Sequence, residues 1–292
     1  MLNENKNAYI TGGASGIGRA LTIQLLEAGW RVFVADRDPS GVQTVATSHN
    51  QRHPILGFTE CEVSSWDSQL AAFQQGLMFL EGRIDFVAPV AGIGEKQWLP
   101  FGAESNCMSA GEFAKPNLSV VDVDLTGVLY TISLAVQQFR RQDILEDDRW
   151  QFRGKIGLVG SVCGLYCVPA LPIYTAAKHA VIGLTRSYGK LLQEECITVN
   201  ALAPHVVRTA ISSDVFYDKL EAEGLLTPMD SLMEAFWDML NGSASGQVYE
   251  CGPESKSWQL REGTNYLDEK SKMCCELLQE IARARGLHYA SS

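Results

Sequence analysis

A tyrosine and a lysine lie four positions apart at the start of a predicted helix, and a serine precedes them. Residues 176–195 have the apolar spacing of a helix, and residues four apart on a helix share one face. Tyr174 and Lys178 should therefore point the same way. Ser161 ends the apolar run 155–161, which predicts a buried strand. We expect a phenol, an ammonium and a hydroxyl to converge there.

These three groups together could transfer a proton. A tyrosine normally loses its proton near pH 10. A cation held a few ångströms away favours the phenolate and lowers that pKa toward neutrality. With a lowered pKa, Tyr174 could take a proton from an alcohol or give one to a carbonyl.

The start of the chain has the order of a dinucleotide-binding βαβ unit. Residues 8–11 predict a short strand, residues 11–18 have the sequence TGGASGIG, a helix follows as far as Gly29, and residues 31–36 predict a second strand that ends at Asp36. The glycines allow the backbone to pass close to a pyrophosphate. The following helix offers its free N–H groups and its dipole to the negative charge.

Asp36 bears on which dinucleotide would bind. A carboxylate at this position accepts hydrogen bonds from the adenosine ribose hydroxyls and repels a 2′-phosphate, which favours NAD over NADP. Arg37 follows directly and could offset that repulsion, since arginine is a good phosphate ligand. We expect NAD, with NADP as the alternative.

Strands and helices continue to alternate along the chain, which predicts a Rossmann-type doubly wound parallel sheet with helices on both faces. We expect one domain over residues 1–292, with a substrate-covering segment at about 211–240 and a helical tail at about 265–292, whose apolar stripe would pack against its own domain. The further predicted strands are 54–63, 84–88, 197–202 and 247–251; the further helices are 67–82, 118–142, two around Pro228 within 211–240, and 268–285; residues 94–117 predict a surface loop.

Composition excludes several classes of protein. The 292 residues are 46% hydrophobic and 20% charged, and the net charge is −10 without any basic run, which argues against nucleic acid or an anionic membrane as partner. The apolar run 156–177 contains glycines and prolines that predict a buried strand, loop and helix start rather than a membrane span. The polar N-terminus is unlike a signal peptide. The eight cysteines form no CxxC or zinc spacing, so we expect free thiols, no metal and a cytoplasmic protein.

The glycine turn, Ser161, Tyr174 and Lys178 together resemble the short-chain dehydrogenase/reductase family, and the resemblance covers residues 8–251. The segments most similar to its NAD-dependent hydroxyprostaglandin dehydrogenase branch are Pro172-Ile173-Tyr174, Lys178-His179, Gly183-Leu184-Thr185-Arg186-Ser187, Asn200-Ala201 and Thr209-Ala210-Ile211.

The resemblance implies a role for each matching residue. Ser161 would hold the substrate oxygen, Tyr174 would be the acid/base, and Lys178 would bind the nicotinamide ribose and lower the pKa of the tyrosine. Asp124 stands where the family has the asparagine of its proton relay. The implied cofactor-binding residues are Gly12, Ser15, Gly16, Ile17, Gly18, Asp36, Arg37, Glu62, Val63, Ala91, Gly92, Tyr174, Lys178, Val207 and Thr209.

Three further positions depart from the family pattern. Residues 89–92 are Pro-Val-Ala-Gly where the family usually has Asn-Asn-Ala-Gly, Glu62 stands for an aspartate, and the usual Pro-Gly is Pro204-His205. These changes and Asp124 put the efficiency of the relay in question. His205 either faces the substrate beside the nicotinamide or is turned to solvent.

The sequence therefore predicts an NAD-dependent dehydrogenase that oxidises a secondary alcohol. The apolar segments 162–172 and 211–240 favour a bulky, mostly apolar substrate such as a lipid, terpenoid or polyketide of secondary metabolism. The alternatives are an NADP-dependent carbonyl reductase and a degenerate dinucleotide-binding member without redox activity. We expect a homodimer or homotetramer, because two predicted helices have more apolar surface than packing against one face of the sheet would bury. The apolar residues of these helices are Val128, Leu129, Ile132, Leu134, Val181, Ile182 and Leu184.

Overall fold

The computed structural model describes residues 6–50, 53–99, 113–147, 150–254 and 258–288. The chain divides into two compact units, Met1–Arg261 and Glu262–Ser292.

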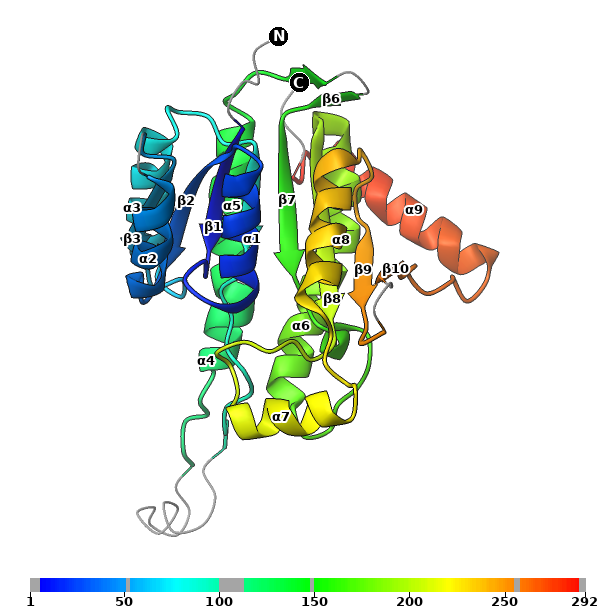
Figure 1. Cartoon of the computed structure of the whole chain (residues 1–292). Helices are drawn as coiled ribbons and strands as arrows, with labels where there is room; N and C mark the ends of the chain where they lie inside the picture. Colours follow the sequence, from blue (N-terminus) through cyan, green and yellow to red (C-terminus); the bar gives the residue numbers. More distant parts are fainter. Residues whose placement is uncertain (1–5, 51–52, 100–112, 148–149, 255–257, 289–292) are drawn as a thin grey trace. The chain divides into compact units, whose positions relative to one another are not determined.

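An eight-stranded sheet forms the centre of the first unit (Figure 1). Its strand order is β10-β9-β8-β7-β4-β1-β2-β3, and all neighbours are parallel except the β9–β10 pair. The chain starts in the middle of the sheet and extends it first to one side and then to the other, so the predicted doubly wound parallel sheet is confirmed. The strands are β1 (Asn7–Thr11), β2 (Arg31–Asp36), β3 (Leu56–Glu60), β4 (Phe86–Pro89), β7 (Gly154–Val159), β8 (Ile197–Pro204), β9 (Val248–Cys251) and β10 (Trp258–Leu260).

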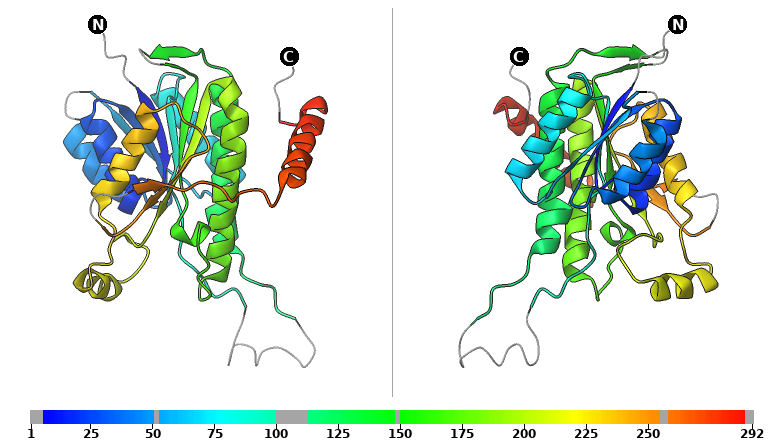
Figure 2. Two further views of the ribbon diagram at one scale, coloured as in Figure 1. Left: turned by 90° about the vertical axis from the view of Figure 1, so that its right-hand side faces the viewer. Right: turned by 60° about the vertical axis from the view of Figure 1, so that its left-hand side comes forward.

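Helices cover both faces of this sheet (Figure 2). One core contains apolar side chains from α1 (Gly16–Glu27), α2 (Ser40–His49) and α8 (Met229–Asn241). The other contains side chains from α3 (Trp66–Phe79), α5 (Val128–Phe139) and α6 (Pro172–Leu192). Strands buried on both faces explain why β7 and β8 are almost continuously apolar.

The carboxyl ends of the parallel strands point to one end of the unit, where α7 (Asp214–Ala222) also lies (Figure 1). In open α/β sheets, ligands bind at this end and beside the point where strand order reverses. The reversal falls between β1 and β4. Only Tyr217 is buried in α7.

The helix predicted over 118–142 is more complex than its apolar pattern indicates. It consists of α4 (Ser119–Val121), a π-helical stretch η2 (Asp122–Gly127) and α5. The stretch Ser119–Phe139 is long and apolar enough to cross a bilayer, although half of it is buried within the protein. Because α5 contributes Val128, Ile132 and Phe139 to the core, we interpret this stretch as a core helix.

Several elements differ from the sequence prediction. Helix α2, strand β10 and the hairpin β5 (Leu145–Asp147) and β6 (Trp150–Phe152) were not predicted. Helix α6 begins at Pro172, four residues earlier than predicted, because proline is favoured at the first helical position. Part of the loop predicted over 94–117, together with Cys107, lies outside the described residues.

The second unit contains α9 (Glu269–Ala284). Asp268 caps it by accepting the Ser271 N–H, 2.8 Å away. The predicted helix is thus confirmed, and the packing of its apolar stripe stays a prediction. The described cysteines are all free.

Candidate active site

Tyr174 and Lys178 lie one turn apart on α6, and Ser161 follows β7 on the same side. The Lys178 Nζ is 5.3 Å from the centroid of the Tyr174 ring. Ser161 caps the short helix η3 (Val162–Gly164), and its Oγ accepts the Cys163 N–H at 3.1 Å. The same hydroxyl lowers the pKa of Tyr174, which places it beside the phenol. The structure therefore brings the three predicted groups together.

Asp124 belongs to the same cluster and pairs directly with the lysine. Its Oδ2 lies 3.0 Å from Lys178 Nζ, and its Oδ1 accepts the Ile93 N–H at 2.8 Å. Lys178 also donates to the Val159 carbonyl at 3.3 Å. Both charged side chains are buried, Asp124 completely and Lys178 to within 5% exposure. A buried pair of this kind needs each charge to compensate the other.

The pKa of Tyr174 is raised rather than lowered. Burial is the main cause, and the Asp124 carboxylate adds to it, while Lys178 and Ser161 lower the pKa by less. Burial alone would lower the pKa of Lys178, but Asp124, Tyr174 and Cys163 together outweigh that effect and raise the pKa. The predicted lowering of the tyrosine pKa is therefore wrong for the protein alone, because burial of the phenol outweighs the effect of Lys178 and the Asp124 carboxylate raises the pKa further.

The glycine turn after β1 has the backbone shape that a pyrophosphate site requires. Gly12 has φ +76° and Gly16 has φ +50°, a region that side chains rarely adopt. A Cβ on Gly12 would lie 2.5 Å from the Ala91 nitrogen, and one on Gly18 would strike the Gly12 carbonyl. Ser15 precedes α1 and Ile17 lies in its first turn, so the helix N-terminus points into this turn.

The predicted adenosine side is assembled at the ends of β2 and β3. The Asp36 carboxylate accepts the Ala14 N–H at 2.9 Å and the Asp38 N–H at 3.0 Å, which fixes it beside the glycine turn. Arg37 is exposed. Val63 is buried, and Glu62 accepts hydrogen bonds from Ser64.

Two other segments complete the predicted cofactor site. The Ala91 N–H donates to the Thr11 carbonyl at 2.9 Å, next to the glycine turn. Gly92 faces Asp124, because a Cβ there would lie 3.3 Å from its Oδ2. Thr209 lies close to Gly16, because a Cβ added to Gly16 would lie 2.9 Å from the Thr209 Cγ2. Val207, two residues before Thr209, is buried.

His205 is part of a polar cluster that the sequence did not indicate. Its Nε2 lies 3.0 Å from Glu250 Oε1. The same carboxylate accepts the Tyr166 hydroxyl at 3.0 Å and pairs with Arg261 Nε at 3.1 Å. Glu250 occupies one ring nitrogen of His205, and 36% of the side chain remains exposed. The position of His205 relative to a substrate stays a prediction.

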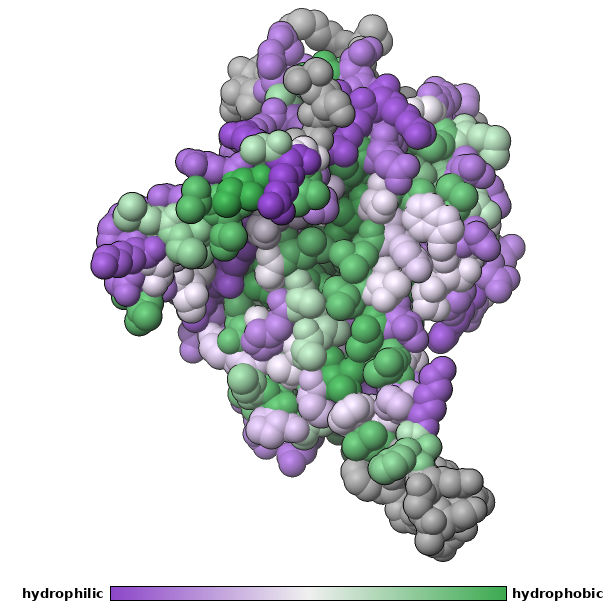
Figure 3. Space-filling model, turned by 180° about the vertical axis from the view of Figure 1, so that it is seen from behind, coloured by the Kyte–Doolittle hydropathy of each residue, from purple (hydrophilic) through white to green (hydrophobic). Residues whose placement is uncertain are grey.

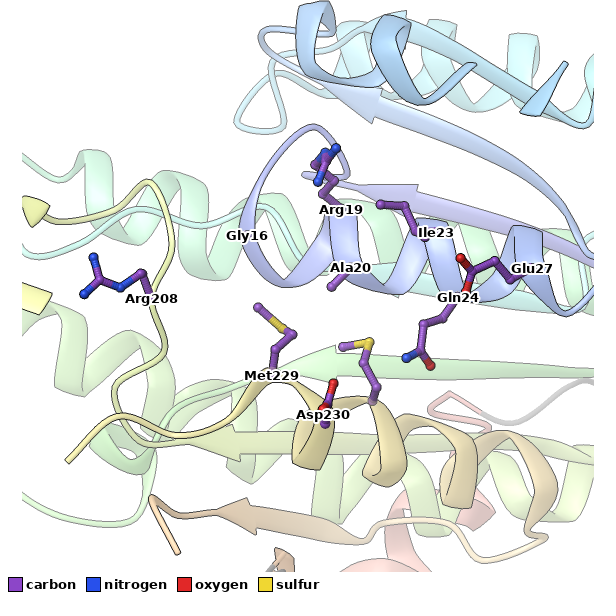
Figure 4. Close-up of a pocket in the computed structure, with 10 residues that line it drawn as sticks. Gly16, Arg19, Ala20, Ile23, Gln24, Glu27, Arg208, Met229 and Asp230 are labelled. Atoms are coloured by element: carbon purple, nitrogen blue, oxygen red, sulfur yellow. The ribbon is translucent and has the colours of Figure 1, made fainter. Parts of the chain in front are cut away.

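A surface cavity of about 450 Å³ lies between α1 and α8 (Figure 4). Gly16 is the only predicted cofactor residue that lines it, and the catalytic candidates do not. We therefore do not identify it with the substrate site. Among the described residues, no group of three His, Cys, Asp or Glu side chains is placed to hold a metal ion.

Comparison with known proteins gives matches over most of the chain. Residues 6–220 match the family described as short chain dehydrogenase. The chain is 31% identical over 269 residues to 5′-hydroxyaverantin dehydrogenase of Dothistroma septosporum, covering 86% of this chain and 85% of that protein. It is 34% identical over 186 residues to NADP-dependent dehydrogenase clz5 of Cochliobolus lunatus, covering 62% of this chain and 63% of that protein.

The alignments with several curated relatives span 58 to 64% of the length of those proteins. Among solved structures, 3-ketoacyl-(acyl-carrier-protein) reductase from Brucella melitensis, complexed with NADH, has a TM-score of 0.67 at 24% identity and covers 86% of this chain and 98% of its own. That likeness supports the fold. The Dothistroma and Cochliobolus relatives are fungal dehydrogenases, and neither shows the hydroxyprostaglandin dehydrogenase branch.

Proposed function

Because the chain belongs to the short-chain dehydrogenase/reductase family, we propose that it oxidises a secondary alcohol of a bulky, mostly apolar small molecule to a ketone, with NAD as hydride acceptor. The observation that carries this proposal is the convergence of Tyr174, Lys178 and Ser161 at the carboxyl ends of the strands. The name of the Dothistroma relative supports a substrate from secondary metabolism such as a polyketide.

The proposed mechanism assigns one task to each of these side chains. Ser161 holds the substrate oxygen by a hydrogen bond. The Tyr174 phenolate takes the proton of the substrate hydroxyl, while the substrate carbon that bears this hydroxyl loses a hydride. Lys178 stabilises the phenolate, and Asp124 holds Lys178 in place. When bound, the oxidised dinucleotide supplies the hydride acceptor and a positive charge.

The residues of the glycine turn fit a dinucleotide. Gly12 and Gly16 have positive φ angles, and a side chain at either position would strike Ala91 or Thr209, so glycine keeps the turn in this shape. The first turn of α1 offers free N–H groups to phosphate. Asp36 would bind the adenosine ribose, Glu62 and Val63 would flank the adenine, and Val207 and Thr209 would hold the nicotinamide end. Arg37 and the name of the Cochliobolus relative favour the second candidate, an NADP-dependent carbonyl reductase on the same fold.

Cofactor preference is tested by measuring reduction of NAD and NADP with a panel of secondary alcohols such as 1-tetralol. The wild type should use NAD. Asp36→Ala should raise the KM for NAD about tenfold, because hydrogen bonds to a charged group are lost. It should also reduce the preference for NAD over NADP, because the repulsion between Asp36 and the 2′-phosphate disappears. A wild type that prefers NADP would overturn the assignment of Asp36, and absence of turnover with either cofactor would count against the function.

We further propose that the protein forms a homodimer, or a tetramer built from such dimers, through α5 and α6. Hydrophobic side chains gather on the face of the first unit where these helices lie (Figure 3). Of the seven residues named for this role, Val128, Ile132, Leu134, Val181 and Ile182 are buried inside the protomer. Only Leu129, which is 41% exposed, and the partly buried Leu184 can reach a partner.

Light scattering should therefore give at least twice the 32.0 kDa mass of one chain. Leu129→Glu should shift the protein toward monomers, since it would place a charge in an apolar interface. Met78→Glu is the matched control, because Met78 is an exposed apolar residue of α3. A monomer mass for the wild type at micromolar concentration would contradict the proposal.

A further inference from the structure

The helix that carries Tyr174 begins without a capping side chain of its own. Helix α6 starts at Pro172, which has no N–H, and the preceding Leu171 makes no side-chain capping bond. The N–H groups of Ile173 and Tyr174 are left as free donors in the first turn, and these are the donors that a capping side chain normally satisfies. The cap has to come from another part of the chain.

Glu95 supplies it from the segment that follows β4. Its Oε2 accepts the Tyr174 N–H at 2.7 Å, and its Oε1 accepts the Ile173 N–H at 3.4 Å. The carboxylate is partly buried. Hydrogen bonds to an ionised acceptor are stronger than neutral ones, and a negative charge is favourable at a helix N-terminus. Glu95 thus binds the backbone of the acid/base residue itself.

The segment that bears Glu95 is also attached to the buried ion pair. Two residues earlier, the Ile93 N–H donates to Asp124 Oδ1 at 2.8 Å, and the other carboxylate oxygen contacts Lys178. Residues 93–95 therefore connect the ion pair to the first turn of α6. This connection fixes the start of the helix relative to the lysine by a route independent of the helix itself.

We propose that Glu95 is a positioning residue for Tyr174, an inference that rests on the proposed function. Tyr174 is the third residue of α6, so fraying of the first turn would displace its phenol. Lys178, one turn further on and paired with Asp124, would stay in place. Loss of Glu95 would therefore separate the phenol from Lys178 and Ser161, and a displacement of about 1 Å at a reacting group can cost about a hundredfold in rate.

The test compares Glu95→Ala and Glu95→Gln with the wild type, using NAD and the most active alcohol of the panel. Glu95→Ala should lower kcat at least about tenfold. The KM for the alcohol and the affinity for NAD should stay within about twofold, because the Glu95 carboxylate is engaged by the helix N–H groups. Glu95→Gln keeps an acceptor oxygen and should restore kcat to within about threefold of the wild type.

A second measurement needs no substrate. The tyrosinate absorbance of each protein is measured as a function of pH, with and without the additional substitution Tyr174→Phe. The difference between the two curves is the titration of Tyr174. In Glu95→Ala its pKa should fall toward the ordinary tyrosine value, because burial, the main cause of the raised pKa in the wild type, is lost when the first turn frays. In Glu95→Gln it should stay near the wild-type value.

Gln97→Ala is the matched control. Gln97 lies on the same segment, is exposed, and donates to the Leu99 carbonyl within its own loop. If Glu95→Ala matches this control in kcat and in the Tyr174 titration, the proposal is overturned. If Glu95→Ala does not fold, the result for Glu95→Gln tests the proposal instead. If Glu95→Gln loses as much turnover as Tyr174→Phe, an acceptor oxygen at position 95 is not sufficient to position Tyr174, and the proposal is overturned. Failure of the proposed function would appear separately, as no alcohol oxidation by the wild type, and the titration would still test Glu95.

Discussion

Tyr174→Phe is expected to abolish alcohol oxidation while NAD binding persists. The change removes only the phenolic hydroxyl, which is the group that accepts the proton in the proposed mechanism. General acid/base catalysis contributes about 10² to 10⁴ in rate, so kcat should fall about a thousandfold. The remaining contacts proposed for NAD lie on the glycine turn, Asp36 and Thr209, and these are unchanged.

The measurement is the initial rate of NADH formation, paired with a titration of NADH binding by fluorescence. A variant that retains more than a few per cent of the wild-type rate would remove Tyr174 from the acid/base role. Thr175→Val, a change at the neighbouring position on α6, serves as control and should keep most of the rate.

Asp124→Asn is expected to move the rising alkaline limb of kcat/KM to lower pH. The Asp124 carboxylate raises the pKa of Tyr174 and that of Lys178. Asparagine keeps an oxygen for the Ile93 N–H and removes the negative charge. The tyrosine should then ionise at lower pH, because a negative charge that disfavours the phenolate has been removed. Because activity requires the phenolate, the sign of the shift is toward acid.

The same substitution should destabilise the fold, since it leaves the buried Lys178 without its counter-charge. Removing one partner of a buried pair costs about 3 to 5 kcal/mol, measured as the free energy of unfolding in denaturant. The pKa of Lys178 is higher in the folded state than in the unfolded state, where it is about 10.4. The stabilisation that results is complete at pH values below the unfolded-state pKa, and it is lost as the pH rises through the folded-state pKa. Unfolding at neutral pH therefore reports the whole effect. An unmoved alkaline limb with lowered stability would make Asp124 a structural residue only.

The sequence predicted the parts of this site that depend on short-range pattern. Tyr174 and Lys178 follow from helical spacing, and the glycine turn with Asp36 follows from a local βαβ order. The strands buried on both faces were visible as continuous apolar runs. Helix α2 was missed because its ten residues are mostly small and polar, with only Val42, Val45 and Ala46 buried.

Contacts between distant segments could not be predicted in this way. Asp124 was identified as a departure from the family asparagine, but its direct contact with Lys178 depends on the π-helical stretch η2, and apolar periodicity does not reveal such a stretch. Glu95 lies 79 residues from Tyr174, in a segment that looked like an irregular loop. A helix start with proline and an apolar preceding residue was the one available signal that a cap was missing.

Helix α7 buries Tyr217 alone, and this has a consequence for local stability. The segment is held by ion pairs of Arg208 with Asp214, Asp218 and Glu221, whose carboxylates are all more than two thirds exposed. Exposed pairs contribute about 0 to 1 kcal/mol each. The free energy for opening α7 is therefore a small part of that for unfolding the sheet. Its amide hydrogens should exchange with solvent by local opening, long before those of β7 and β8.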